Sequence, residues 1–190
     1  MNRRDALKYT SLSFGYAITA TSLGALMQSC QSDVESDGWS PAALSKAQAN
    51  LLAEIAETML PETDTPGAKS VMVHRYIDKF YAGYLNAENR GKALNQFKLM
   101  EAHLNQAGAS KFVKLSAEER LKVLGALNSA ALKAKDPNDL QAAYLGLKGL
   151  VISTFFSTEK IGTEVLAYAP VPGPYKGCIP LESVGKAWSL

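Results

Sequence analysis

The sequence predicts an all-α protein, a compact bundle of about five or six helices followed by an irregular C-terminal strap rich in proline and glycine. Three observations predict this fold. Apolar residues recur every three or four positions through most of the chain, which is the spacing of one helix face. Capping boxes stand where two of these apolar runs begin. Prolines and glycines concentrate at the junctions between runs and in residues 168–190.

The composition is that of a globular protein with one domain. Of the 190 residues, 47% are hydrophobic and 20% are charged, as in ordinary soluble domains. Removing the three basic residues and one acidic residue of positions 1–30 from totals of 20 and 18 leaves 17 of each sign. Because the remainder is neutral, the composition gives no reason to expect a nucleic-acid partner or an anionic membrane surface.

The first residues resemble a bacterial twin-arginine signal. Arg3 and Arg4 are followed by Leu7 and Lys8, although Ala6 stands where that pattern often has phenylalanine. The apolar run that follows is diluted by serine, threonine and glycine, which argues against a permanent membrane span of about 20 apolar residues. We therefore expect residues 1–30 to be a removable signal that exports the protein to the periplasm. The alternative is a chance arginine pair before an apolar helix.

The run ends at Ser29-Cys30, which loosely resembles a lipoprotein cleavage box. We favour lipidation of Cys30, which would anchor the mature protein because each buried methylene contributes about 0.8 kcal/mol. The alternative is ordinary cleavage, which releases a soluble periplasmic protein. Lipidation would also prevent a disulfide with Cys178, the other cysteine of the chain. The polar residues 31–40 indicate a flexible tether, and residues 41–190 form the predicted helical domain.

The first helix of the domain is predicted to begin after Ser45, which forms a capping box with Gln48. It should end before Pro61, because the residue before a proline avoids helical geometry. The following Pro-Glu-Thr-Asp-Thr-Pro-Gly-Ala predicts a turn. We expect Asp64 in this turn to accept backbone hydrogen bonds; the alternative is a catalytic carboxylate.

Helices are next expected over residues 69–85 and 89–107, the second ending at Gly108. A second capping box, Ser116 with Glu119, opens another helix. The apolar residues that we place along one side of the 69–85 helix are Val73, Ile77, Phe80, Tyr81 and Tyr84.

The last long helix is predicted to begin at Asp136-Pro137, since proline is tolerated in a first turn. Its residues 140–156 are apolar almost all round, which places such a helix in the middle of a bundle or beneath a partner. Its length, and Lys148 inside it, favour a core helix over a membrane span. A short helix near residues 161–166 should follow.

The C-terminal residues 168–190 differ from the rest, with four prolines and three glycines spaced among aromatic residues. A stretch of this length without helix is usually functional or disordered. We interpret it as a strap laid over a surface, which belongs either to its own bundle or to a partner.

The sequence assigns no catalytic, cofactor-binding or metal-binding residues. His74 and His103 have no second ligand at metal-site spacing, so we interpret them as surface or interface histidines. Cys-x-x-Cys, Gly-x-Gly-x-x-Gly, phosphate-loop and Gly-x-Ser-x-Gly patterns do not occur. We therefore do not expect the chain to be catalytic alone, although missing motifs do not disprove catalysis.

Four ordered segments, behind the twin-arginine leader, resemble the gluconate 2-dehydrogenase subunit 3 family. The family often has aspartate where Ala169 stands and an acidic residue near Lys176, so the partner surface can differ here. The segments that carry the resemblance are Leu60–Ala68, Phe155–Gly162, Tyr168–Leu181 and Gly185–Trp188.

The resemblance implies a small, cofactor-free subunit of a membrane-associated sugar or polyol dehydrogenase. The large subunit would be an FAD-dependent oxidoreductase of the glucose–methanol–choline type, and a cytochrome c with haem c would take the electrons. The small subunit would escort the flavoprotein through the twin-arginine translocase, which exports folded proteins. The alternative is a stand-alone lipoprotein of the cell envelope that acts as a binding or structural module. We expect the partner contact at Asp64, Pro66, Tyr168, Tyr175 and Trp188.

Overall fold

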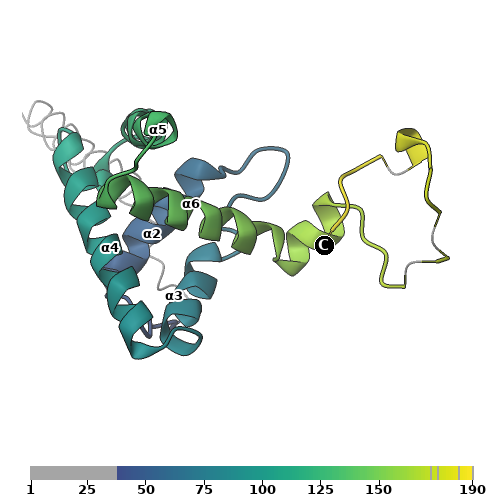
Figure 1. Cartoon of the computed structure of the whole chain (residues 1–190), viewed down its shortest axis with the longest axis horizontal. Coiled ribbons are helices and arrows are strands. Elements are labelled where there is room, and N and C mark those ends of the chain that lie inside the picture. The colour runs from purple at the N-terminus through teal and green to yellow at the C-terminus, as the bar shows by residue number, and fades with distance from the viewer. Residues whose placement is uncertain (1–37, 172, 175, 184, 190) are drawn as a thin grey trace, which may run out of the picture. The chain divides into compact units, whose positions relative to one another are not determined.

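The computed structural model describes residues 38–171, 173–174, 176–183 and 185–189. The chain divides into two units, Met1–Trp39 and Ser40–Leu190, and the second holds the helices of Figure 1. The all-α prediction is confirmed. The α-helices of the described residues are α2 (Lys46–Met59), α3 (Val73–Gly83), α4 (Ala87–Ala107), α5 (Ala117–Lys133) and α6 (Asp139–Phe156). Short turns of other helix types are η1 (Phe112–Lys114), η2 (Ile161–Val165) and η3 (Leu181–Ser183).

The helices pack around a single apolar core. Figure 1 shows α6 in front of α2, with α4 at the side. Helices α3 and α5 each pack against both α2 and α6, and α4 packs against α3, α5 and α6. Each large apolar side chain fully buried here stabilises the fold by about 1.5–3 kcal/mol. The largest of them are Phe112, Leu52, Ile55, Ile77, Met100, Leu104 and Ile161.

Both predicted capping boxes are present. The Ser45 hydroxyl accepts from the Gln48 backbone, the Gln48 side chain returns to the Ser45 backbone, and Ser116 and Glu119 repeat the arrangement. The predicted start of the last helix at Asp136-Pro137 is wrong. Asn138 is the N-cap of α6 and forms a third capping box with Gln141. The side-chain oxygen of an asparagine can accept a backbone N–H of the first helical turn, whereas proline has no side-chain acceptor.

The expected start of α3 at Lys69 is also wrong, because residues 69–72 form a turn before Val73. The Lys69 backbone N–H is taken by the Glu57 carboxylate at 2.8 Å, and the Ser70 hydroxyl donates to the Gly67 carbonyl at 2.8 Å. Met72 then adopts a left-handed conformation with φ of 57°. Such a residue interrupts a right-handed helix.

A buried carboxylate joins the segment before α2 to α3. Asp78 is 1% exposed and accepts the backbone N–H groups of Ala42, Ala43 and Leu44 at 2.7, 3.0 and 2.8 Å. Three such bonds compensate the cost of burying the charge. Residues 42–44 are therefore fixed to α3.

The described part of the tail has no long helix and closes on itself. The Ala167 N–H donates to the Ala187 carbonyl at 2.7 Å, and the Ser189 N–H donates to the Ala167 carbonyl at 2.8 Å, which makes a parallel bridge between Ala167 and Trp188. In Figure 1 the loop between them extends beyond the end of α6 rather than across the bundle. No described helix is long and apolar enough to cross a membrane.

Candidate partner-binding surface

Helix α6 has one exposed face along its whole length. Its buried residues contact the core from the opposite side, while Lys148 and Ile152 are half-buried at the border. We call the exposed side the α6 outer face; it consists of Ala142, Gly146, Gly149, Ser153 and Phe156. The spacing of these residues alternates between three and four, so they form one stripe. The helix therefore lies in the middle of the bundle and still presents an uncovered surface.

The two glycines of the α6 outer face have no role in the packing of the chain itself. A Cβ atom added at Gly146 or Gly149 would meet no atom within 4 Å. Each glycine in a helix interior costs about 0.5–1 kcal/mol relative to alanine. Both glycines lower the stability of α6 and neither is required by the packing of the chain, which favours a role in contact with another protein. A helix surface without side chains lets another backbone approach closely.

Helix α3 and its two cap residues carry an exposed stripe of one methionine and three aromatic residues. Met72, Tyr76, Phe80 and Tyr84 follow each other at intervals of four residues, and we call them the α3 stripe. Their exposed fractions run from 37% for Phe80 to 82% for Tyr84, and these two rings stack with centroids 6.0 Å apart. Exposed aromatic clusters are typical of protein–protein contact sites.

The α3 stripe corrects the predicted face of this helix. Val73, Ile77 and Tyr81 are buried, whereas Phe80 and Tyr84 are exposed on another side. Burial raises the pKa of the Tyr81 hydroxyl. The interval of four residues from Met72 to Tyr84 is visible in the sequence and could have revealed the stripe.

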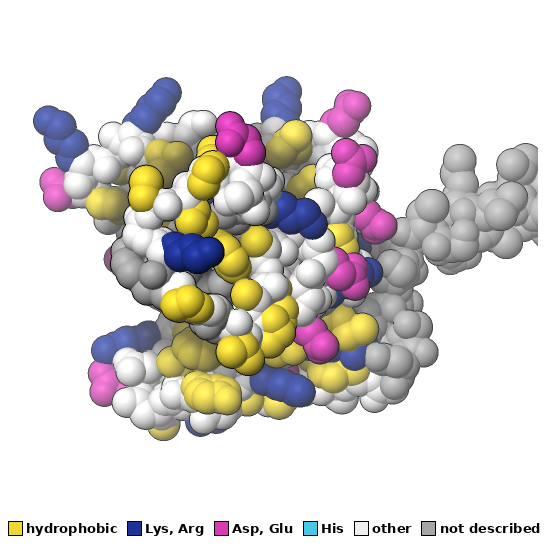
Figure 2. Space-filling view, turned by 90° about the vertical axis from the view of Figure 1, so that its right-hand side faces the viewer, with side chains coloured by type: hydrophobic (Ala, Val, Ile, Leu, Met, Phe, Trp, Pro, Cys, Tyr) yellow, Lys and Arg dark blue, Asp and Glu magenta, His cyan; other side chains and the backbone are white. Residues whose placement is uncertain are grey.

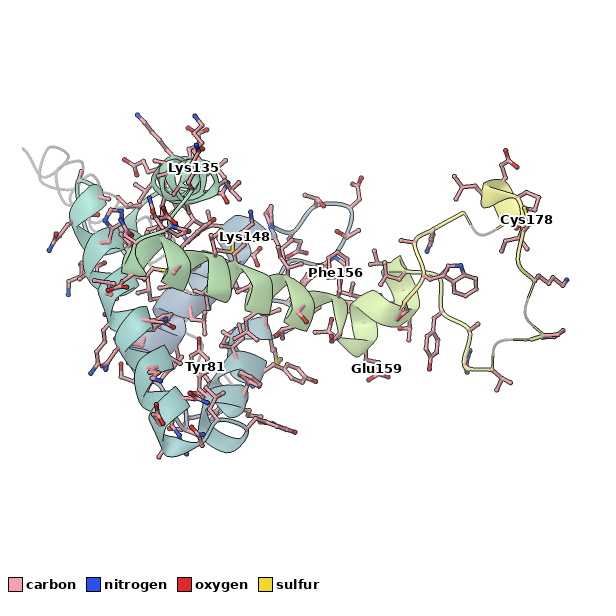
Figure 3. All side chains as sticks on the ribbon, in the orientation of Figure 1. Tyr81, Lys135, Lys148, Phe156, Glu159 and Cys178 are labelled. Carbon is pink, nitrogen blue, oxygen red and sulfur yellow. The ribbon has the colours of Figure 1, made fainter. Side chains whose placement is uncertain are left out.

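The end of the tail extends the α6 outer face. Trp188 and Ala187 line a pocket of about 320 Å³ together with Phe156, Ser153 and Leu166. The Lys186 ammonium also donates to the Glu164 backbone carbonyl at 2.9 Å, which holds the returning segment of the tail against η2. Figure 3 shows Phe156 at the tail end of α6 and Cys178 in the loop beyond it. Cys178 is exposed and unbridged.

Two grooves border α6, one on each side. The first lies toward α3 and α4, has about 330 Å³, and includes Phe80, Phe97 and Gly146. The second lies toward α5 and the end of α2, has about 210 Å³, and includes Lys148 and Ile152. In Figure 2, which faces the tail end of the domain, hydrophobic side chains form a band across the surface and acidic side chains gather mainly along one edge.

The turn after α2 is fixed by glutamates of α2 rather than by Asp64. The Glu57 carboxylate accepts the backbone N–H groups of Glu62 and Lys69 at 3.0 and 2.8 Å. Asp64 is exposed, and Pro66 is half-buried. The Thr63 N–H instead donates to the Thr65 carbonyl at 3.0 Å. Sequence reasoning missed Glu57 because a glutamate in a helix carries no signal for a turn five residues later.

A neighbouring charge cluster connects this turn to α5. Glu54 on α2 forms ion pairs with both Lys69 and Arg120, and the Arg120 Nε–H donates to the Leu115 carbonyl at 3.0 Å. Burial lowers the pKa of Lys69, an effect that Glu57 partly offsets, and burial also lowers the pKa of Arg120. Each group is satisfied by a partner within the fold, so we interpret the cluster as structural.

The residues expected at the partner contact separate into two places. Tyr168 and Trp188 lie at the base of the tail, and both are more than half exposed. Asp64 and Pro66 lie in the turn next to α2. Tyr175 lies outside the described residues, as do the export-signal residues Arg3, Arg4, Leu7 and Lys8 and the lipidation residue Cys30.

The interpretation of His74 as a surface or interface histidine is wrong, because its side chain is 4% exposed within the core side of α3. His103 is half-buried on α4. Within the described ranges, no three His, Cys, Asp or Glu side chains gather in a way that could hold a metal ion.

Exposed apolar and aromatic faces of this kind are typical of proteins that bind other proteins. The chain belongs to the gluconate 2-dehydrogenase subunit 3 family, whose sequence model matches residues 46–173. The match covers helices α2 to α6 and ends before Trp188. No curated protein and no solved structure matches the chain.

Proposed function

We propose that this chain is the non-catalytic small subunit of a periplasmic, FAD-dependent sugar or polyol dehydrogenase. It binds and stabilises a flavoprotein of the glucose–methanol–choline type and escorts it through twin-arginine export. FAD belongs to that large subunit, and haem c to a cytochrome that accepts the electrons. Family membership is the observation that carries the proposal.

The geometry supports a binding role in such a complex. The α6 outer face contains glycines that the chain's own packing does not need, and the α3 stripe exposes aromatic rings beside it. A partner that covers both would bury apolar surface, which stabilises the complex by about 25 cal/mol for each Å² removed from water. The twin-arginine leader and Cys30 fit export and membrane anchoring of the assembled pair, since flavin must be inserted before export.

Affinity purification from the periplasmic or envelope fraction tests the proposal. The tagged chain should bring a flavoprotein with it, and deletion of this chain should leave that flavoprotein in the cytoplasm. The proposal fails if the chain is recovered alone and the flavoprotein is exported without it. That result would instead favour a stand-alone envelope lipoprotein.

The export signal has its own test. Replacing Arg3 and Arg4 together by lysine should retain both this chain and the flavoprotein in the cytoplasm, measured by fractionation and immunoblotting. As a matched control, replacing Lys8 by arginine keeps the charge and should leave export of both chains intact. Normal export of the double variant would indicate the general secretory route.

A further inference from the structure

The groove between α2, α5 and α6 has mainly apolar walls and one charged side chain, Lys148; its other polar side chains are Thr58, Asn128 and Tyr144. Leu60 at the end of α2 and Ile152 on α6 line it. Leu121 on α5 also lines it and is 61% exposed. Covering an exposed leucine at the rim of such a groove with an apolar side chain is favourable, because it removes apolar surface from water.

Lys148 lines the same groove from the middle of α6, as labelled in Figure 3. Its ammonium donates to the Asn128 amide oxygen at 2.8 Å, and the Tyr144 hydroxyl donates to the same oxygen at 3.2 Å. This network holds the half-buried ammonium in place beside the groove. The acceptor is neutral, however, so it does not balance the charge.

The other groove of α6 provides a comparison. Lys92 lines that groove and pairs with Glu88 at 2.7 Å. In the part of the chain that the structure describes, the carboxylates that form ion pairs are Glu54 and Glu88, and neither pairs with Lys148. A half-buried cation favours an anionic partner, because the attraction between opposite charges grows as water is excluded.

From this charge and these walls, we infer that the groove docks an apolar segment of the dehydrogenase's large subunit that carries an Asp or Glu carboxylate. The carboxylate pairs with the Lys148 ammonium, and the flanking apolar side chains cover Leu121 and Ile152. The groove borders the α6 helix and the turn after α2, so it is continuous with the surface described above. The inference rests on the proposed function for the identity of the partner.

The test uses the full chain and the flavoprotein that co-purifies with it, with affinity measured at several salt concentrations. Lys148→Met keeps the apolar stem and should weaken binding about tenfold, while Lys148→Glu should weaken it about a hundredfold. Binding to the Lys148→Met variant should also depend less on salt than binding to wild type. Lys148→Arg keeps the charge and should bind within about threefold of wild type.

Matched variants separate docking from folding. Lys135→Glu makes the same charge change at an exposed position outside the groove and should leave the affinity unchanged. Leu121→Ser removes an exposed apolar contact with little effect on the core, and should weaken binding about tenfold. This variant keeps the inference testable if a Lys148 substitution lowers the unfolding temperature of the free chain.

The outcomes distinguish the inference from the proposed function. A wild-type complex that Lys148→Glu and Leu121→Ser both leave intact overturns the inference alone. A wild-type chain that binds no flavoprotein overturns both. If the free chain is a dimer that Lys148→Glu dissociates, a second copy occupies the groove and the inference is wrong.

Discussion

At the scale of single residues, the fold depends on side chains that connect distant parts of the chain. Asp78 fixes residues 42–44, which lie 34 to 36 positions earlier, and Glu57 fixes the turn that follows its own helix. Both carboxylates accept backbone N–H groups that would otherwise have no partner inside the protein. These residues attach the segment before α2 to α3 and set how α2 connects to α3.

Gly67 is predicted to be essential for this turn. A Cβ atom there would lie 2.5 Å from the Glu57 Oε1 atom and 2.6 Å from the Glu62 backbone nitrogen. Gly67→Ala should therefore lower the free energy of unfolding by about 1–3 kcal/mol, measured by urea denaturation. Gly91→Ala on α4 is the control, because nothing lies within 4 Å of its added Cβ, and it should stabilise slightly. Equal effects of the two substitutions would contradict the close approach.

Little of this residue-level detail can be predicted from the sequence. Ser45 and Ser116 were identifiable because a capping box is a local pattern of four residues. Asp78 was not, because its partners are backbone groups brought to it only by the tertiary fold. Aspartate is a residue type that often accepts hydrogen bonds in turns, which is why Asp64 was expected in this role. In the structure, Glu57 on the preceding helix accepts the backbone N–H groups of the turn instead.

At the scale of elements, the helices are set by local signals and their faces by packing. The type and approximate extent of each helix follow from periodicity, caps and breakers. The sidedness of α6 could not be predicted because it is apolar almost all round, so no polar side marked its exposed face. On α3, Phe80 and Tyr84 were placed on the same side as Val73, although the structure exposes both of them.

The cap of α5 predicts a dependence of stability on pH. Glu119 accepts hydrogen bonds from the Ser116 backbone N–H and hydroxyl, which lower the pKa of its carboxyl group. Because the folded pKa lies below the unfolded one, this contribution is present at neutral pH and is lost as the pH falls through the folded pKa. Glu119→Gln should therefore reduce the loss of stability on acidification, measured by thermal unfolding at a series of pH values. An unchanged acid dependence would refute this role of Glu119.

The α6 outer face predicts opposite effects on stability and binding. Gly149→Ala should raise the free energy of unfolding of the free chain by about 0.5–1 kcal/mol, because helix propensity improves and no atom opposes the new Cβ. Gly149→Trp should leave the chain folded and abolish its complex with the flavoprotein, measured by co-purification. A complex that tolerates tryptophan at this position would show that the face is not covered.

At the scale of the whole molecule, the described residues form a helical domain with exposed faces on α3 and α6. Family membership could be predicted because it rests on sequence segments such as Leu60–Ala68, which can be read without knowing what these residues contact. The partner surface could be predicted only in part, since exposed faces of α3 and α6 arise from how the helices pack together. The contact expected at the tail and turn residues stays a prediction, because no partner is present and Tyr175 lies outside the described residues.

Native mass spectrometry of the gently purified complex tests the central claim most directly. We predict a complex of this chain with a flavoprotein, which on dissociation releases this chain at its polypeptide mass, with any acyl groups on Cys30, and leaves FAD with the large subunit. Recovery of FAD, haem or a metal ion on this chain alone, with substrate turnover in the absence of the flavoprotein, would contradict the account.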